Sequence, residues 1–183
     1  MNTIITSREA ILEGCRKLIQ KEGPSGLSIR KLADSMNIST GSIYHYFSSK
    51  SALLEAAIES VWMEIFSDYG RDLYFDHFED CVNWIFSCLR ESEKRYPGFL
   101  ELHSTLVQDR ALQDTKGAMW HAWHHLRGVL SESLKHDPSF SDRKDQSVQV
   151  AGDAVFSLIL SSVYLHWMDE KSVLAFVRQY VLH

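Results

Sequence analysis

Residues that break or cross-link a chain are scarce in this sequence of 183 residues. It contains only 3 prolines and 9 glycines, which favours long helices over a many-stranded sandwich. Its 3 cysteines are Cys15, Cys81 and Cys88, an odd number with no CxxC pair. We therefore expect a reduced, cytoplasmic protein whose thiols pack as small hydrophobes. A redox switch between Cys81 and Cys88 is the alternative to two buried thiols.

A long hydrophobic run is also lacking. The most apolar stretch, residues 154–168, is uncharged over 15 residues and is followed by Asp169 and Glu170. A membrane-spanning helix needs about 20 apolar residues, so we predict no membrane segment. The N-terminus has no basic start followed by an apolar core, and we expect no signal peptide.

An overall excess of positive charge, which is usual in nucleic-acid binders, is absent because the formal net charge is −5. The charge is nevertheless uneven. Residues 1–50 hold 7 basic and 4 acidic residues, a net charge of +3, which leaves 12 basic and 20 acidic residues, or −8, for the remainder. A basic head on an acidic body is typical of a module that docks one end on a polyanion, although chance is the alternative explanation.

Apolar residues recur at helical spacing along the whole chain, and we find no strand pattern. The sequence therefore predicts an all-α fold of about nine helices. Thr6 and Glu9 have capping-box spacing and predict the start of the first helix. The expected helices cover residues 6–22, 28–37, 39–47, 48–68, 76–94, 99–108, 114–135, 143–168 and 171–181.

Residues 28–47 have the pattern of a helix, a tight turn and a second helix. Ser28 and Ser39 are predicted N-caps, and Asn37 tolerates the left-handed conformation that the turn needs. Two short helices joined in this way form the DNA-binding unit whose second helix enters the major groove. Ile43 and Phe47 are expected to pack inward, opposite the surface that faces the duplex.

The chemistry of this segment suits a DNA backbone and base edges. The N-terminus of the helix at Ser28 offers a hydroxyl and backbone N–H groups to a phosphate, and Lys50 can neutralise another. Gly41 allows the backbone to approach the duplex closely. The second helix presents no acidic side chain. Its hydrogen-bonding side chains are Ser39, Thr40, Ser42, Tyr44 and His45.

Residues 6–54 resemble the N-terminal DNA-binding domain of the TetR family of transcriptional regulators. Three runs carry the resemblance: TSREAIL at 6–12, LSIRKLA at 27–33 and STGSIYHYFSSK at 39–50. The likeness covers about a quarter of the chain. Asn37 stands where the family often has Gly, and Cys15 where it often has Ala.

The resemblance implies a homodimer, in most cases a repressor, that binds a near-palindromic operator and is released by a small molecule. It implies a three-helix helix-turn-helix head at residues 1–50 and a helical ligand-binding and dimerisation domain at 51–183, with no enzymatic activity and no cofactor. By position, Ser28, Tyr44 and Lys50 would contact phosphate, and Thr40, Gly41 and His45 would lie nearest the bases. We favour core packing for Tyr46 and reject it for Tyr44.

The body is expected to supply the dimer face. In the family the last two helices form a four-helix dimer interface, and we assign residues 146–168 and 171–181 to it. The apolar surface of residues 146–168 is wider than burial against a single core requires. The small residues of this range permit close approach of another helix. An ordinary buried core helix is the alternative.

Aromatic residues are frequent in the body and suggest an apolar pocket for an apolar or aromatic inducer. Core packing is the alternative for each residue of the expected lining: Trp84, Cys88, Phe99, His103, Trp123 and Tyr164.

Two further functions remain open. His121 and His125 share one side of a helix and would supply two metal ligands, with His103 or Asp114 as a third. No Glu lies between them, so this is not the HExxH motif of zinc proteases, and surface or interface histidines are the alternative. A small metal-dependent hydrolase and a helical protein–protein adaptor are therefore the competing hypotheses, but neither explains the pattern from Ser28 to Lys50.

Overall fold

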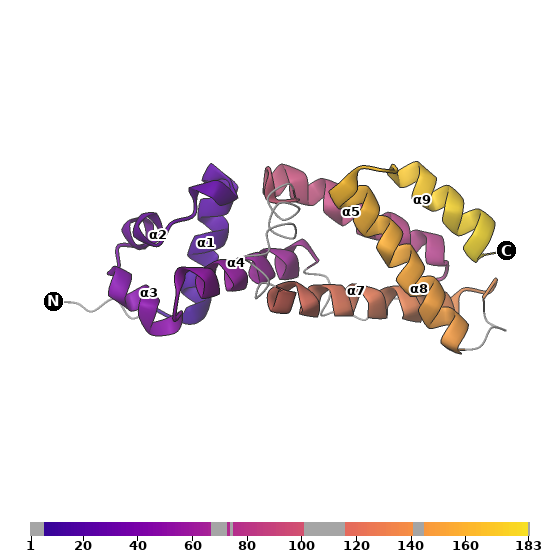
Figure 1. Cartoon of the computed structure of the whole chain (residues 1–183), viewed down its shortest axis with the longest axis horizontal. Coiled ribbons are helices and arrows are strands. Elements are labelled where there is room, and N and C mark those ends of the chain that lie inside the picture. The colour runs from indigo at the N-terminus through magenta and orange to yellow at the C-terminus, as the bar shows by residue number, and fades with distance from the viewer. Residues whose placement is uncertain (1–5, 67–72, 74, 101–115, 141–144, 183) are drawn as a thin grey trace. The chain divides into compact units, whose positions relative to one another are not determined.

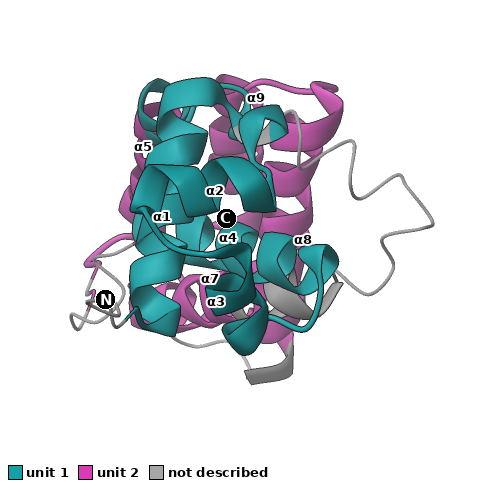
Figure 2. Cartoon of the chain, turned by 90° about the vertical axis from the view of Figure 1, so that its left-hand side faces the viewer, with its two compact units in different colours: residues 1–64, 92–119 teal, residues 65–91, 120–183 magenta. Residues whose placement is uncertain are grey.

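Helices account for every regular element in the computed structural model of the chain (Figure 1). The structure describes residues 6–66, 73, 75–100, 116–140 and 145–182, and no strand occurs in these ranges. The all-α prediction is confirmed. The chain divides into two compact units, coloured in Figure 2: unit 1 is residues 1–64 and 92–119, and unit 2 is residues 65–91 and 120–183.

Unit 1 begins with four helices: α1 (Arg8–Glu22), α2 (Ile29–Met36), α3 (Thr40–Tyr46) and α4 (Lys50–Ile65). One apolar side of each helix is buried, and helix α1 contacts α2, which contacts α3. Gly23 ends α1 with φ 72°, as the predicted break requires. The core shared by the four helices includes Ile11, Cys15, Ile19, Leu32, Ile43, Phe47, Leu53 and Ala57.

The start of α1 differs from the prediction by one residue. Ser7, not Thr6, is the N-cap, and its Oγ accepts a hydrogen bond of 3.1 Å from the backbone N–H of Ala10. With Ser7 as N-cap, Glu9 lies at N2 rather than N3 and forms no capping box, and its carboxylate pairs with Arg16 two turns along the helix. Both hydroxyl residues have a side chain suited to capping, so the sequence alone left the choice open.

The remaining elements are α5 (Phe78–Arg95), α7 (Lys116–His136), α8 (Asp145–Leu160), the π-helical turn Ser161–Leu165, α9 (Glu170–Phe176) and the π-helical turn Val177–Val181. These agree with the four helices predicted for the body outside residues 99–108. Of that range only residues 99 and 100 are described, and both are helical. The predicted break at residues 95–98 is present, with Gly98 at φ 73°.

Unit 2 is held by polar contacts between helices as well as by its apolar core. Asp137 directly follows α7, is only 1% exposed, and accepts hydrogen bonds from the backbone N–H groups of Phe78 at 2.7 Å and Ser139 at 2.8 Å. It therefore caps the first turn of α5, a helix distant in the sequence. Arg178 binds the carboxylate of Glu79, which connects the C-terminal turn to the same end of α5.

Helices α7 and α8 of unit 2 lie in close contact. Gly152 of α8 is buried, and a Cβ at this position would come within 2.9 Å of the Oγ of Ser131. Arg127 of α7 binds the carboxylate of Asp153 with two hydrogen bonds of 2.6 and 2.8 Å. The small residue at 152 thus serves packing within the chain.

By length and composition alone, one helical stretch in the described part of the chain is apolar enough to cross a membrane. It is Ser147–Leu165, with a mean hydropathy of 1.6 and only 28% of its length buried. The sequence prediction missed it because the uncharged run was counted from Ala154, after Asp153. That carboxylate is paired with Arg127, and the low burial means that much of the apolar side is exposed.

Replacing Asp137 by Ala should lower the free energy of unfolding by about 1–3 kcal/mol, because the buried N–H of Phe78 and the part-buried N–H of Ser139 lose their acceptor. Thermal unfolding followed by circular dichroism measures this change. Glu132→Ala, which removes an exposed carboxylate of α7 paired with Lys135 on the same helix, is the control and should shift the melting temperature little. Equal shifts in the two variants would contradict the capping role.

Candidate nucleic-acid interface

The turn between α2 and α3 is built as the sequence predicts. Ser28 caps α2, and its Oγ accepts a hydrogen bond of 3.2 Å from the backbone N–H of Lys31. Asn37 ends α2 in the left-handed conformation, with φ 52° and ψ 43°. Its N–H and that of Ile38 donate to carbonyls in the last turn of α2, and the chain is thereby redirected into α3 within three residues.

Helix α3 has one buried and one exposed side. Ser39 caps it by accepting a hydrogen bond of 3.1 Å from the N–H of Ser42, and the two hydroxyls lie 2.9 Å apart. Ile43 is completely buried, which confirms its predicted inward direction. The exposed side carries Thr40, Gly41, Tyr44 and His45.

Of the two tyrosines of α3, Tyr44 is exposed as predicted, but Tyr46 is not buried in the core. Tyr44 is 51% exposed, in agreement with its assignment to the outer side. Tyr46 is 39% exposed, so its predicted place in the core is wrong. Its phenol donates a hydrogen bond of 2.6 Å to the carbonyl of Thr6, and the edge of its ring meets His45. The ring thus ties α3 to the residues before α1, a contact that only the tertiary structure defines.

Free positive charge remains at the end of the head where α2 and α4 begin. Ser28 and Lys50 both line a hollow of about 200 Å³, together with Ser25, Leu27, Ile29, Leu53 and Leu54. Lys50 is exposed and pairs with no acidic residue in the described ranges, whereas Lys31 is bound to Glu22 at 2.8 Å. This hollow brings together the Ser28 hydroxyl, the N-terminus of α2 and the Lys50 ammonium. Groups of these three kinds bind phosphate.

Ion pairing explains which cations give the head its charge of +3. Arg16, Lys17 and Lys31 are bound to Glu9, Glu13 and Glu22, so these three pairs cancel. Four cations and one carboxylate remain without such a partner among the described residues: Arg8, Lys21, Arg30, Lys50 and Asp34. The exposed Arg30 was not among the predicted contacts, although its place in the first turn of α2 was readable from the sequence.

Comparison with known proteins decides the family. Residues 11–57 match the family model described as bacterial regulatory proteins, tetR family. These residues form a TetR-family DNA-binding domain. The chain is 28% identical over 167 residues to the nucleoid occlusion factor SlmA of Vibrio cholerae serotype O1, covering 86% of this chain and 84% of that protein. It is 36% identical over 151 residues to the HTH-type transcriptional repressor AcnR of Corynebacterium efficiens, covering 82% of this chain and 63% of that protein.

Solved structures of other regulators share the fold. The transcriptional regulator FadR of Bacillus subtilis, crystallised with stearoyl-CoA, aligns with a TM-score of 0.61 at 16% identity, covering 94% of this chain and 98% of that chain. A TerR/AcrR-family regulator of Aquifex aeolicus aligns with a TM-score of 0.50 at 18% identity, covering 94% and 96%. At these identities the likeness concerns the fold. As a TetR-family member, this chain is a DNA-binding transcriptional regulator.

The residues predicted to line a ligand pocket are spread over the two units of this TetR-family chain. Phe99 lies in unit 1, where its ring centroid is 5.5 Å from that of Trp62. In unit 2, the ring centroid of Trp84 lies 5.8 Å from that of Phe75, and the ring centroid of Trp123 lies 6.2 Å from that of Phe156.

Trp123 and Tyr164, both in unit 2, are brought together. Burial raises the pKa of the Tyr164 phenol, while a hydrogen bond from Trp123 opposes the rise. Cys88 is half-buried, and His103 lies outside the described residues. The structure therefore joins one pair of the predicted lining residues directly.

The metal hypothesis falls mostly on side chains outside the described residues, and the redox hypothesis falls on described ones. Asp114 and His103 lie outside the described residues, and so does the side chain of His121. No cluster of three or more metal-ligating side chains occurs among the residues that are described. Burial raises the pKa of the Cys15 and Cys81 thiols to about 12, which suppresses their thiolates, and none of the three cysteines forms a disulfide.

Replacing Ser39 by Ala should destabilise the DNA-binding head by about 1 kcal/mol, because the first turn of α3 loses its side-chain cap. Chemical denaturation followed by circular dichroism measures the change. The exposed Ser48, which lies just after α3, provides the matched control as Ser48→Ala and should remain close to the parent protein. No difference between the two variants would mean that the cap contributes nothing.

Proposed function

We propose that this chain is a ligand-responsive cytoplasmic repressor that binds a near-palindromic DNA operator as a homodimer and is released by a small-molecule inducer. In this proposal residues 1–50 form the DNA-binding domain and residues 51–183 the ligand-binding and dimerisation domain. One observation carries it. The capped helix α3 exposes an acid-free side, and on the same head Ser28 and the uncompensated Lys50 line one hollow.

The proposed contacts divide into positioning and reading. Tyr44, Lys50 and Ser28 contact phosphates and fix the register, since such contacts carry little sequence information. Thr40, Gly41 and His45 lie nearest the base edges of the major groove. Ser39 and Ser42 stand at the N-terminus of α3, where their hydroxyls form a hydrogen bond with each other. We propose that both hydroxyls also lie within reach of the DNA backbone.

The dimer interface is proposed for residues 146–168 and 171–181, which include nearly all of α8 and α9 and the π-helical turns that follow them. Val150 and Tyr180 are 65% and 64% exposed, which is unusual for large apolar side chains. They border an apolar hollow of about 470 Å³ on unit 2, lined by Phe140, Ser147, Val150, Ala151, Ala154, Phe176, Tyr180 and Val181. A second copy of the chain, pairing α8 and α9 with its own, would cover this side, and a two-fold operator requires such a symmetric partner.

Two relatives support the finer parts of the proposal. AcnR of Corynebacterium efficiens is named a transcriptional repressor, and FadR of Bacillus subtilis was crystallised with stearoyl-CoA. We infer that the inducer of this chain is likewise apolar or aromatic. The proposed lining is Trp84, Cys88, Phe99, His103, Trp123 and Tyr164.

Selection from random duplex DNA should enrich a two-fold symmetric sequence. Lys50→Ala should weaken binding to it and lower the salt dependence by about one counterion per head, because each head loses one phosphate contact. Tyr44→Ala should weaken binding as well. Lys17→Ala is the control, because Lys17 is already paired with Glu13 on another side of the head. Enrichment of no symmetric sequence by the parent protein would contradict the function.

Val150→Asp should convert the dimer into a monomer, because it buries an unpaired charge at the centre of the proposed interface. Sedimentation equilibrium measures the mass. Gly128→Asp places the same residue at an exposed position of α7 and should leave the dimer intact. A parent protein that sediments as a monomer, or a Val150→Asp variant that stays dimeric, would contradict this interface.

A further inference from the structure

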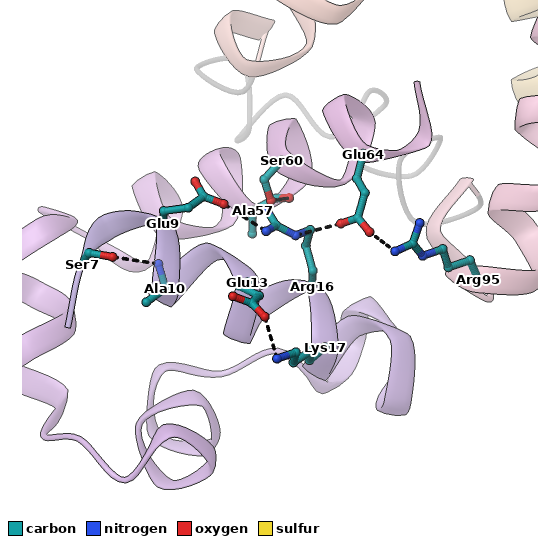
Figure 3. Close-up of polar contacts among 10 residues, drawn as sticks. All are labelled: Ser7, Glu9, Ala10, Glu13, Arg16, Lys17, Ala57, Ser60, Glu64 and Arg95. Carbon is teal, nitrogen blue, oxygen red and sulfur yellow. Dashed lines mark hydrogen bonds and ion pairs between the residues drawn. The ribbon is translucent and has the colours of Figure 1, made fainter. Parts of the chain in front are cut away.

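A chain of alternating charges joins three helices within unit 1 (Figure 3). Arg16 of α1 binds Glu9 through one terminal nitrogen at 3.0 Å and binds Glu64 of α4 through Nε at 2.8 Å. The second carboxylate oxygen of Glu64 binds Arg95, the last residue of α5. Glu64 therefore holds an arginine on each oxygen, and the two arginines come from elements far apart in the sequence.

The Arg16–Glu64 pair is more buried than the other pairs of the head, whereas Arg95, the second partner of Glu64, is 53% exposed. The side chains of Arg16 and Glu64 are 17% and 24% exposed, whereas those of Lys17 and Glu13 are 71% and 54% exposed. Solvent screens the exposed pair, which lies within one helix, far more strongly. The pairs of Glu64 join helices, so their loss affects how helices sit on one another.

An apolar layer backs the charged one. Trp62, two residues before Glu64, is 3% exposed and meets the ring of Phe99 edge-on. Tyr96 is completely buried, and its pKa is raised to about 12 by that burial and by the neighbouring Glu64. The guanidinium of Arg95 lies 5.7 Å from the centre of the Tyr96 ring. Residues 95–99 therefore brace α4 through a cation, a phenol and an aromatic ring.

We propose that Glu64 is a positioning residue for DNA binding, the shared counter-ion that ties α4 both to α1, through Arg16, and to the end of α5, through Arg95. The inference rests on the proposed function, because positioning has a consequence only if the head reads an operator. Withdrawing Arg95 frees one oxygen of Glu64 and leaves α4 held to α1 by the Arg16 pair but no longer held to the end of α5 by an ion pair. The head then samples a wider range of orientations, and a dimer loses the fixed presentation of two recognition helices that two half-sites require.

Because of this arrangement, the position of residues 95–99 affects operator affinity. The chain passes between the units within α5, whose last turn from Ser92 belongs to unit 1. A change that shifts this turn by the length of one ion pair releases Glu64 from Arg95 without touching α3. Operator affinity thus depends on a contact remote from the DNA-reading residues.

The test uses the full chain and a symmetric duplex selected by the parent protein. Glu64→Gln and Arg95→Gln should each weaken binding to that duplex by about fivefold to tenfold, the usual size of coupling in a shared charge network. Binding to a scrambled duplex should not change, because no phosphate contact is lost. The double variant should be no weaker than the weaker single one, and Arg95→Lys should restore most of the affinity.

Two carboxylates provide matched controls with the same substitution. Glu13→Gln breaks an exposed pair on α1, and Glu79→Gln breaks the pair with Arg178 in unit 2; both should keep the parent affinity. All measurements are made where circular dichroism reports a fully folded protein. Equal loss on the selected and the scrambled duplex, or no loss in Glu64→Gln, would overturn the positioning role.

Hydrogen exchange separates this inference from the function on which it rests. Arg95→Gln should speed exchange of the amides of α1 at Cys15 and Ile19, although Arg95 lies on another helix, and this readout needs no DNA. Unchanged protection of α1 would overturn the inference even if the parent protein binds an operator. If the parent protein selects no symmetric duplex, the proposed function fails, and the positioning role fails with it.

Discussion

The exposed side of α3, the proposed DNA-reading surface, depends on the burial of two side chains, Ile43 and Phe47. Helix α3 has only 7 residues, far fewer than the roughly 12–15 that an isolated helix needs to persist in water. Its stability therefore comes from the cap at Ser39 and from the apolar contacts of Ile43 and Phe47, which are 0% and 4% exposed. The exposed residues of the same helix are consequently free to be polar, because they contribute little to the core.

The electrostatics of the head follow the same division between structure and recognition. Three of its carboxylates are consumed in ion pairs with Arg16, Lys17 and Lys31, and the first of these pairs extends through Glu64 to Arg95. Of the cations that remain, Arg8, Arg30 and Lys50 stand at helix starts, and Lys21 lies in the last turn of α1. An overall charge of −5 is thus compatible with a DNA-binding protein, since the acidic excess lies outside the first 50 residues.

Local features of the head were predictable because they are set by neighbouring residues. The caps at Ser28 and Ser39 and the left-handed Asn37 each depend on a few adjacent positions, and the structure has all three. The one-residue error at Ser7 and the misplaced Tyr46 have a common cause. Each depends on a partner elsewhere, Arg16 for Glu9 and the Thr6 carbonyl for Tyr46, and spacing along one helix does not contain that information.

Features between distant segments were not predictable for the same reason. The Asp137 cap on α5, the two arginines on Glu64 and the contact of Gly152 with Ser131 join residues that no periodic pattern relates. The π-helical turns that end α8 and α9 carry no sequence signature either. The apolar lining proposed from composition alone is the least constrained part, because large aromatic residues pack a core and line a pocket equally well.

Hydroxyl-radical footprinting on a selected duplex tests the central claim most directly, because it reports the backbone contacts of both heads at once. The account predicts two protected patches related by two-fold symmetry, with centres about one helical turn or a multiple of it apart, each reduced in Lys50→Ala. A single patch, protection without symmetry, or protection unaffected by Lys50→Ala would contradict it.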